Sequence, residues 1–273
     1  MNHFIPCLSI AGSDPSCGAG IQADLKTFSA LGVYGLTVPT AITIQNTRGV
    51  QAVHALDATL VKAQLKALFE DIPIHAVKIG MTVNTAIIQV IVDILHHYRP
   101  PFVVLDPIIA STSGHRLIEE ESIDYLKKHL FPLCSLITPN LPETQLLTST
   151  TSTTSFQEVL DAGTLLLETG CQHVLIKGGH HTGTKDSTDI LLSAKGHQVF
   201  TASRIESSNT HGTGCTLSSA IAAYVGLGFS LPDAISQAKT YLTEALLSAK
   251  DLILGQGEGP LNHFFAPQPQ IIK

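Results

Sequence analysis

The chain has 273 residues, of which 44% are hydrophobic and 14% are charged. This composition provides enough apolar material for a folded core and excludes an intrinsically disordered protein. Sixteen Lys and Arg residues against 22 Asp and Glu residues give a formal net charge of −6. Such a charge offers no basic footprint for nucleic acid or for an anionic membrane surface, so we expect a small-molecule ligand held by a local site.

The amino terminus and the cysteines indicate the compartment. No basic stretch precedes an apolar run at the amino terminus, and no apolar run reaches the roughly 20 residues that a membrane span needs. The five cysteines are odd in number and form no Cys-x-x-Cys pair, which argues against disulfides and structural zinc. We therefore expect a cytoplasmic protein with free thiols and no membrane contact.

The first half of the chain alternates between apolar runs and helical patterns. We predict strands over residues 7–11, 36–45, 76–79 and 102–105, and helices over 21–32, 59–70 and 85–98. Asp57 and Asn84 precede two of these helices as N-caps. Short apolar strands separated by helices are typical of a largely parallel sheet that is covered on both faces, an α/β fold.

The same alternation continues to the carboxyl end. We predict further strands over residues 135–138 and 173–176, a hairpin over 189–201, and helices over 214–227 and 231–254. The Ser/Thr-rich stretch 148–155 reads as a connection before a helix that starts near Phe156. No composition shift or repeat divides the chain, so we expect a single domain over residues 1–273.

Polar residues follow several of the predicted strands. These residues are Gln45, Asp106, Glu143 and Lys177. In an open parallel sheet, ligands bind beyond the carboxyl ends of the strands. Each of these residues alone reads as a loop cap or a surface charge, but their recurrence at successive strand ends favours a site. Two acids with a lysine suit Mg²⁺-nucleotide chemistry.

Two glycine-rich segments precede helices, one over residues 12–20 and one over residues 211–215. A helix N-terminus presents unpaired N–H groups, and glycines let the backbone approach an anion closely. Neither segment is Gly-x-Gly-x-x-Gly and no Walker A motif is present, so dinucleotide-binding and P-loop folds lose support. Both segments are candidate phosphate cradles, and a plain strand-to-helix connection is the alternative for the first.

Three single residues have two interpretations each. Cys215 lies in the first turn of a predicted helix, where the helix dipole lowers a thiol pKa and makes a base or nucleophile; a buried, inert cysteine is the alternative. Asp24 has no lysine on its own helix face, so its partner could be a ligand amine; a solvated carboxylate is the alternative. Met81 could equally belong to the core.

Several long motifs occur in one order along the chain. They are Ala-Gly-Ser-Asp-Pro-Ser-Cys-Gly-Ala-Gly-Ile-Gln-Ala-Asp-Leu-Lys-Thr at 11–27, Gln-Asn-Thr at 45–47, Lys-Ile-Gly-Met at 78–81, Leu-Ile-Thr-Pro-Asn-Leu-Pro-Glu at 136–143, Lys-Gly-Gly at 177–179 and Asn-Thr-His-Gly-Thr-Gly-Cys at 209–215. With these motifs the chain closely resembles the hydroxymethylpyrimidine/phosphomethylpyrimidine kinases, a family with the ribokinase-like fold. The resemblance runs from about residue 8 to residue 264.

The resemblance implies two successive phosphorylations in thiamine biosynthesis. The first acts on 4-amino-5-hydroxymethyl-2-methylpyrimidine and the second on its monophosphate, with ATP and Mg²⁺ as cosubstrate and cofactor and with a homodimer as the assembly. By the family match, the pyrimidine pocket is lined by Gly12, Asp24, Gln45 and Met81. The match assigns the nucleotide phosphates to Lys177, Thr210, Gly212, Thr213 and Gly214, Mg²⁺ to Asp106 and Glu143, and the general base to Cys215.

One residue departs from the family pattern. Cys17 stands where the family usually has glycine, and a side chain there restricts a positive φ. We expect activity to survive, because Gly18 and Gly20 remain. Two alternative functions stay open at this point: a pyridoxal kinase, which phosphorylates a similar hydroxymethyl group, and a catalytically silent pyrimidine-binding module.

Overall fold

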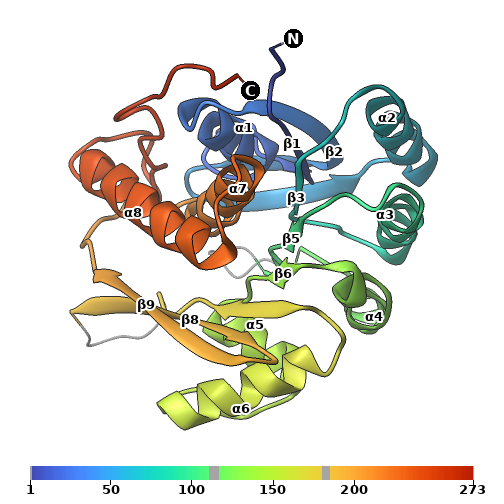
Figure 1. Ribbon diagram of the computed structural model, residues 1–273. Helices are drawn as coiled ribbons and strands as arrows, with labels where there is room; N and C mark the ends of the chain where they lie inside the picture. Colours follow the sequence, from blue (N-terminus) through green and yellow to red (C-terminus); the bar gives the residue numbers. More distant parts are fainter. Residues whose placement is uncertain (1, 111–116, 180–184, 273) are drawn as a thin grey trace.

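A computed structural model describes residues 2–110, 117–179 and 185–272. They form a nine-stranded sheet with the order β3-β2-β1-β4-β5-β6-β7-β8-β9 (Figure 1). The strands are β1 (Pro6–Ser13), β2 (Tyr34–Asn46), β3 (Gly49–Ala55), β4 (Ala76–Ile79), β5 (Val103–Leu105), β6 (Leu136–Ile137), β7 (His173–Ile176), β8 (Asp186–Ser193) and β9 (Gly196–Ser203). Six neighbouring strands pair in parallel, namely β2, β1, β4, β5, β6 and β7, while β3 at one edge and β8 and β9 at the other are joined by antiparallel pairing.

Helices cover both faces of this sheet (Figure 1). One layer contains α1 (Gly20–Ala30), α7 (Thr213–Gly226) and α8 (Leu231–Ala249). The other layer contains α2 (Ala58–Asp71), α3 (Thr85–Tyr98), α4 (Glu120–Tyr125), α5 (Leu141–Thr148) and α6 (Phe156–Leu167). A π-helical turn (Leu126–Leu130) and a 3-10 turn (Phe131–Leu133) extend α4. The predicted α/β fold, largely parallel with helices on both faces, is confirmed.

Two hydrophobic cores lie on the two faces because side chains alternate along each strand. Leu8 and Ile10 of β1 pack in the core beneath α2 and α3, whereas Cys7 packs in the core beneath α1, α7 and α8. The same alternation holds in β5, where Val104 faces the second core. Burial on both faces explains why the central strands read as short, continuous apolar runs in the sequence.

The element boundaries agree with the sequence in most places. Asp57 accepts hydrogen bonds from the N–H groups of Thr59 and Leu60, and Asn84 accepts one from Ile87, so both predicted N-caps are confirmed. The sequence analysis did not predict β3, because this edge strand has no fully buried residue to mark a period. The predicted final helix is too long: α8 ends at Ala249, where the Asn209 amide donates to the carbonyl oxygens of Ala249 and Leu252.

Candidate active site

An ion pair lies at the carboxyl ends of β5 and β7. Lys177 Nζ is 2.7 Å from Asp106 Oδ1, and both side chains are largely buried. Thr138, which follows β6, points its hydroxyl at the same oxygen from 3.3 Å. The parallel sheet brings these three residues together because β5, β6 and β7 end at the same edge.

Glu143 stands next to this pair in the first turn of α5. Its carboxylate accepts the N–H of Asn140 at 2.9 Å, which completes a capping box, and the N–H of Ile109 at 3.2 Å. Burial raises the pKa of Glu143; the charge of Lys177 opposes this shift and that of Asp106 adds to it. The three charged groups therefore interact, so the structure brings together the predicted phosphate-binding lysine and the two predicted metal ligands.

The first turn of α7 approaches the ion pair closely. A Cβ placed on Gly214 would lie 3.0 Å from Asp106 Oδ2 and 3.3 Å from Lys177 Nζ. Gly212 has a φ of +87°, and a Cβ there would come within 1.8 Å of the Gly18 carbonyl oxygen. Both glycines are thus required by close approach, and the two glycine-rich segments of the sequence pack against each other.

Thr213 and Cys215, the other two residues of this turn, are less accessible to a ligand than the sequence suggested. The Thr213 N–H donates to the Thr210 carbonyl oxygen at 3.2 Å, within the loop itself. Cys215 is buried, and burial raises the pKa of its thiol to about 11, although the charge of Lys78 opposes the shift. The expectation that the helix dipole lowers this pKa is therefore wrong, since desolvation of the thiolate outweighs it.

Asp24 is fully buried and its carboxylate is fully partnered. Lys78 from β4 donates to both of its oxygens at 2.7 and 2.9 Å. Ser9 and Ser219 donate to it as well, at 2.5 and 2.7 Å. Both sequence interpretations, a ligand amine as partner and a solvated carboxylate, are wrong: the partner is a lysine on a strand of the sheet, which helix-face spacing could not reveal.

Gly12, Met81 and Gln45 gather beside the two glycine-rich segments. A Cβ on Gly12 would meet Met81 Cε at 2.1 Å, so these two residues are in contact. The Met81 carbonyl accepts a hydrogen bond from Thr40 at 2.6 Å. The side-chain amide of Gln45 lies 3.0 Å from His211 Nε2. Of the four predicted pyrimidine-pocket residues, Gly12 and Met81 therefore contact each other and Gln45 contacts His211, whereas the Asp24 side chain is fully buried.

Asp14, His211 and Lys78 are three further residues of this region, and none of them was predicted from the sequence to have a role. Asp14 Oδ2 is 2.8 Å from His211 Nε2, and its carboxylate also accepts the N–H groups of Ser16, Gly18 and Ala19. This arrangement ties the first glycine-rich loop to the second. A signal was present for Lys78, because a lysine inside the otherwise apolar strand Ala76–Ile79 requires a buried partner.

Cys17 adopts the conformation that the family glycine would favour. Its φ is +59°, in the left-handed region, and its carbonyl accepts a hydrogen bond from Lys26 at 2.8 Å. The side chain at this position therefore does not prevent the loop from forming, but it adds backbone strain.

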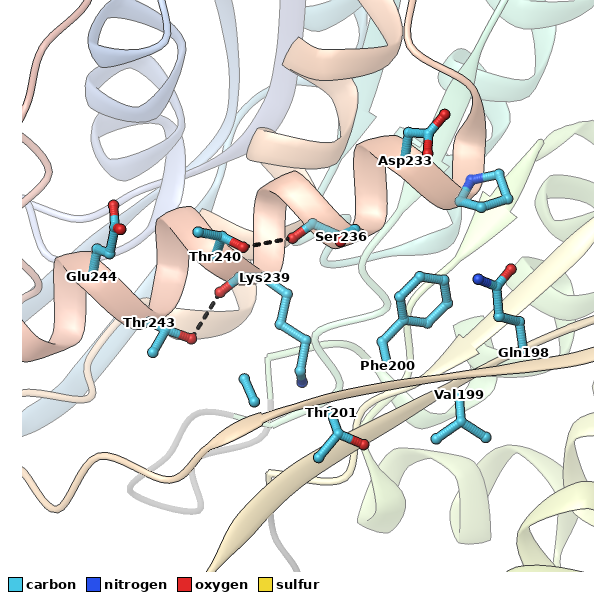
Figure 2. Close-up of a pocket in the computed structure, with 12 residues that line it drawn as sticks. Gln198, Val199, Phe200, Thr201, Asp233, Ser236, Lys239, Thr240, Thr243 and Glu244 are labelled. Atoms are coloured by element: carbon cyan, nitrogen blue, oxygen red, sulfur yellow. Dashed lines mark hydrogen bonds between the residues drawn. The ribbon is translucent and has the colours of Figure 1, made fainter.

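A cavity of about 560 Å³ lies between β9 and α8 (Figure 2). Phe200 and Thr201 line it from the strand, and Lys239 and Thr243 line it from the helix. Lys239 Nζ is 2.6 Å from Asp189 Oδ2, and Asp189 Oδ1 accepts the N–H of Gly178 at 2.9 Å. This chain of contacts joins the cavity to the residue after Lys177.

Charge of both signs and a helix N-terminus meet at one edge of the sheet, as the electrostatic stabilisation of phosphoryl transfer requires. Together with the fold, this defines a ribokinase-like small-molecule kinase. The solved phosphomethylpyrimidine kinase of Clostridium difficile 630 is 45% identical with a TM-score of 0.78, over 88% of this chain and 99% of that one. The ADP complex of the Staphylococcus aureus pyridoxal kinase is 30% identical with a TM-score of 0.87, over 96% of this chain and 94% of that one.

The chain belongs to the phosphomethylpyrimidine kinase family, whose sequence model matches residues 14–262. The hydroxymethylpyrimidine/phosphomethylpyrimidine kinase of Escherichia coli (strain K12) is 47% identical over 262 residues, which cover 96% of this chain and 98% of that protein. Among the described residues, no helix is both long and apolar enough to cross a membrane.

Proposed function

We propose that this kinase phosphorylates 4-amino-5-hydroxymethyl-2-methylpyrimidine and then its monophosphate at the expense of ATP, as a step of thiamine biosynthesis. The observation that carries this proposal is the 47% identity to a hydroxymethylpyrimidine/phosphomethylpyrimidine kinase over 96% of the chain. The site supports it, because a region suited to a small ring lies beside a region suited to phosphates.

Lys177 and the first turn of α7 bind and stabilise the transferred phosphoryl group. The Lys177 ammonium contacts the phosphate oxygens, and the backbone of Gly212, Thr213 and Gly214 receives the charge that develops on them, with Thr210 beside it. The partial positive charge of the α7 N-terminus adds to this stabilisation. The Thr213 N–H has to leave the Thr210 carbonyl, a 3.2 Å contact, in order to face a phosphate.

Asp106 and Glu143 fit Mg²⁺, because both offer the carboxylate oxygens that this ion prefers as ligands. Lys177 occupies Asp106 Oδ1, whereas Oδ2 faces the Gly214 backbone and is the oxygen that a phosphate-bound cation would meet. Both Glu143 oxygens accept backbone N–H groups, so Glu143 would hold the ion through water. Bound there, Mg²⁺ would neutralise phosphate charge and orient the phosphate chain.

Cys215 is the proposed general base for the hydroxymethyl group. The thiol lies in the turn that receives the phosphoryl group, one residue after Gly214. A base with a pKa near 11 is almost entirely protonated at neutral pH. The proposal therefore requires that the small fraction of protein in which Cys215 is a thiolate accepts the proton of the substrate hydroxyl, so the rate should rise with pH.

Gly12, Gln45 and Met81 receive the pyrimidine ring. Gly12 leaves room for the Met81 side chain, Met81 offers the ring an apolar contact, and Gln45 pairs with the polar edge of the ring. Asp24 supports this region from below through Lys78 and has no exposed surface for a ligand.

The cavity between β9 and α8 is the proposed place for the nucleoside part of ATP. Its volume of about 560 Å³ lies in the range of small-molecule sites. Lys239 and Asp189 connect it to Gly178 and thus to the phosphate-binding lysine. A relative solved with ADP supports the use of an adenine nucleotide.

Three broader expectations are retained as proposals. The single sheet supports one kinase domain over residues 1–273. Ile42 and Ile44 are about half exposed on β2, the strand next to the sheet edge, and such exposed apolar residues support a homodimer, which light scattering would test. The five free cysteines support a cytoplasmic location.

The test is to incubate the protein with Mg-ATP and, separately, the hydroxymethylpyrimidine, its monophosphate and pyridoxal. Conversion of the alcohol through to the pyrophosphate, identified by mass, is the expected result, and a Lys177→Met variant is the inactive control. ADP release with pyridoxal alone would refute the proposal, and so would ligand binding without ADP release.

Pyridoxal phosphorylation is the second candidate function. It is favoured by the TM-score of 0.87 to the S. aureus pyridoxal kinase, which exceeds the value of 0.78 for the C. difficile phosphomethylpyrimidine kinase. Sequence identity runs the other way, at 30% against 45%. We therefore expect pyridoxal to be turned over with a lower kcat/KM than the pyrimidine.

A further inference from the structure

A chain of hydrogen-bonding groups connects the two glycine-rich segments to Gln45. His211 Nε2 lies 2.8 Å from Asp14 Oδ2 and 3.0 Å from Gln45 Nε2. Thr43 Oγ1 lies 3.2 Å from Gln45 Oε1 and 2.9 Å from the carbonyl oxygen of Ser13, and its one hydroxyl proton can go to only one of these two acceptors. Asp14, His211 and Thr43 have no part in the proposed phosphoryl transfer, so the chain needs a separate explanation.

Asp14 is ionised and can only accept protons. Burial alone would raise the pKa of Asp14, but hydrogen bonds from His211, Ser16 and Ala19 outweigh it and lower the pKa to about 2. An ionised carboxylate has no donor. The proton between Asp14 and His211 therefore sits on His211 Nε2.

This proton decides which end of the Gln45 amide faces the imidazole. A protonated Nε2 has no lone pair to accept from an NH₂ group, so the amide has to face His211 with its oxygen, turned over from the orientation in which Gln45 Nε2 lies 3.0 Å away. The contact with Thr43, at the other end of the amide, requires the same orientation of Gln45. The single hydroxyl proton of Thr43 goes to the Ser13 carbonyl, so Thr43 offers a lone pair to the amide and requires the NH₂ end there. The two ends of an amide have the same shape, and the surrounding network decides between them.

We propose that His211 and Asp14 are positioning residues that fix the direction of the Gln45 amide and thereby select the amino-pyrimidine edge of the substrate. The proposal rests on the proposed function, in which Gln45 contacts the ring. With its direction fixed, Gln45 presents one N–H and one carbonyl lone pair in a set order. A 4-amino-pyrimidine offers a ring-nitrogen acceptor beside an amino donor, whereas its 4-oxo analogue offers a ring N–H beside a carbonyl, the reverse order.

The experiment measures binding of the 4-amino-pyrimidine and its 4-oxo analogue by calorimetry, without nucleotide. We expect the wild type to prefer the 4-amino compound at least about tenfold, since a mismatched edge leaves polar groups unpaired. His211→Phe keeps a ring against Gly18 but has no proton to give, and it should lose most of this preference. His211→Gln is the matched variant, because its NH₂ can donate to both Asp14 and Gln45, and it should retain the preference.

A second readout needs no substrate. In ¹⁵N-histidine-labelled protein, His211 Nε2 should be protonated at neutral pH, with the signal assigned by its loss in His211→Gln. An unprotonated Nε2 overturns the inference, as does an unchanged preference in a folded His211→Phe variant. A wild type that binds neither pyrimidine overturns the proposed function, and the ¹⁵N signal still judges the hydrogen-bond chain.

Discussion

Lys78 of β4 and Asp24 of α1 form a completely buried ion pair, with Nζ 2.7 Å from Oδ2 and neither side chain exposed. Ser219 of α7 donates to the same carboxylate, one helical turn after Cys215. The pair therefore links the sheet, α1 and the helix whose first turn approaches the phosphate-binding residues. Removal of either partner leaves a charge without compensation in a dry environment.

We expect Lys78→Met to lower the free energy of unfolding by about 3–5 kcal/mol, because Asp24 then remains buried and unpaired. Chemical denaturation measures this change. The double variant Lys78→Met with Asp24→Asn should recover much of the loss, since no unpaired charge remains. If the two single substitutions simply add in the double variant, the pair is not coupled and this explanation is wrong.

Cys17→Gly should stabilise the protein by about 1 kcal/mol. Cys17 holds a φ of +59°, which costs an L-residue roughly this amount and costs glycine little. Thermal or urea unfolding measures the gain. Cys17→Ala is the matched control, because it keeps the Cβ and the strain, and an equal gain in that variant would assign the effect to the thiol instead.

The pH dependence of kcat/KM tests the general-base proposal. Burial raises the pKa of the Cys215 thiol to about 11, and a base acts in its deprotonated form, so activity should rise with pH. We expect an increase of about tenfold per unit between pH 7 and pH 9. A kcat/KM that is flat in this range would show either that Cys215 is not the base or that its pKa in the free enzyme lies far below 11.

Cys215→Ala separates these last two outcomes. It should lower kcat strongly while the affinity for the pyrimidine changes little, because the proton acceptor is lost and the pocket is not. An undiminished kcat in this variant would remove Cys215 from the mechanism.

Gly214 and Gly226 lie at opposite ends of α7 and should respond to alanine in opposite ways. The Gly214 Cβ position is 3.0 Å from Asp106 Oδ2, whereas the Gly226 position is 2.9 Å from Cys7 Sγ in the core. Gly214→Ala should cost about 100-fold in kcat by displacing the ion pair, with little loss of stability. Gly226→Ala should cost about 1–3 kcal/mol of stability through overpacking, with kcat retained. Loss of activity in both, in proportion to unfolding, would contradict a specific role for Gly214.

The sequence by itself determined the layered fold and most of the helix starts. Buried strands of a parallel sheet read as short apolar runs, and Asp57 and Asn84 mark helix starts through local hydrogen bonds. The order of the motifs was sufficient to identify the family. Because ligands bind beyond the carboxyl ends of parallel strands, the sequence also predicts that Asp106 and Lys177 lie at one edge of the sheet, where they are 2.7 Å apart. These are properties of neighbours in the chain or of a general topology.

Only the tertiary structure decided the partners of the buried charges and the state of the thiol. Lys78 and Asp24 are 54 positions apart, and no local spacing indicates that they meet. The pKa of Cys215 depends on desolvation by elements packed around α7, which outweighs the helix dipole that the sequence suggested. Asp14 and His211 are 197 positions apart, so their contact likewise could be seen only in the folded structure. Local pattern sets secondary structure, whereas long-range contact and burial set the chemistry of each group.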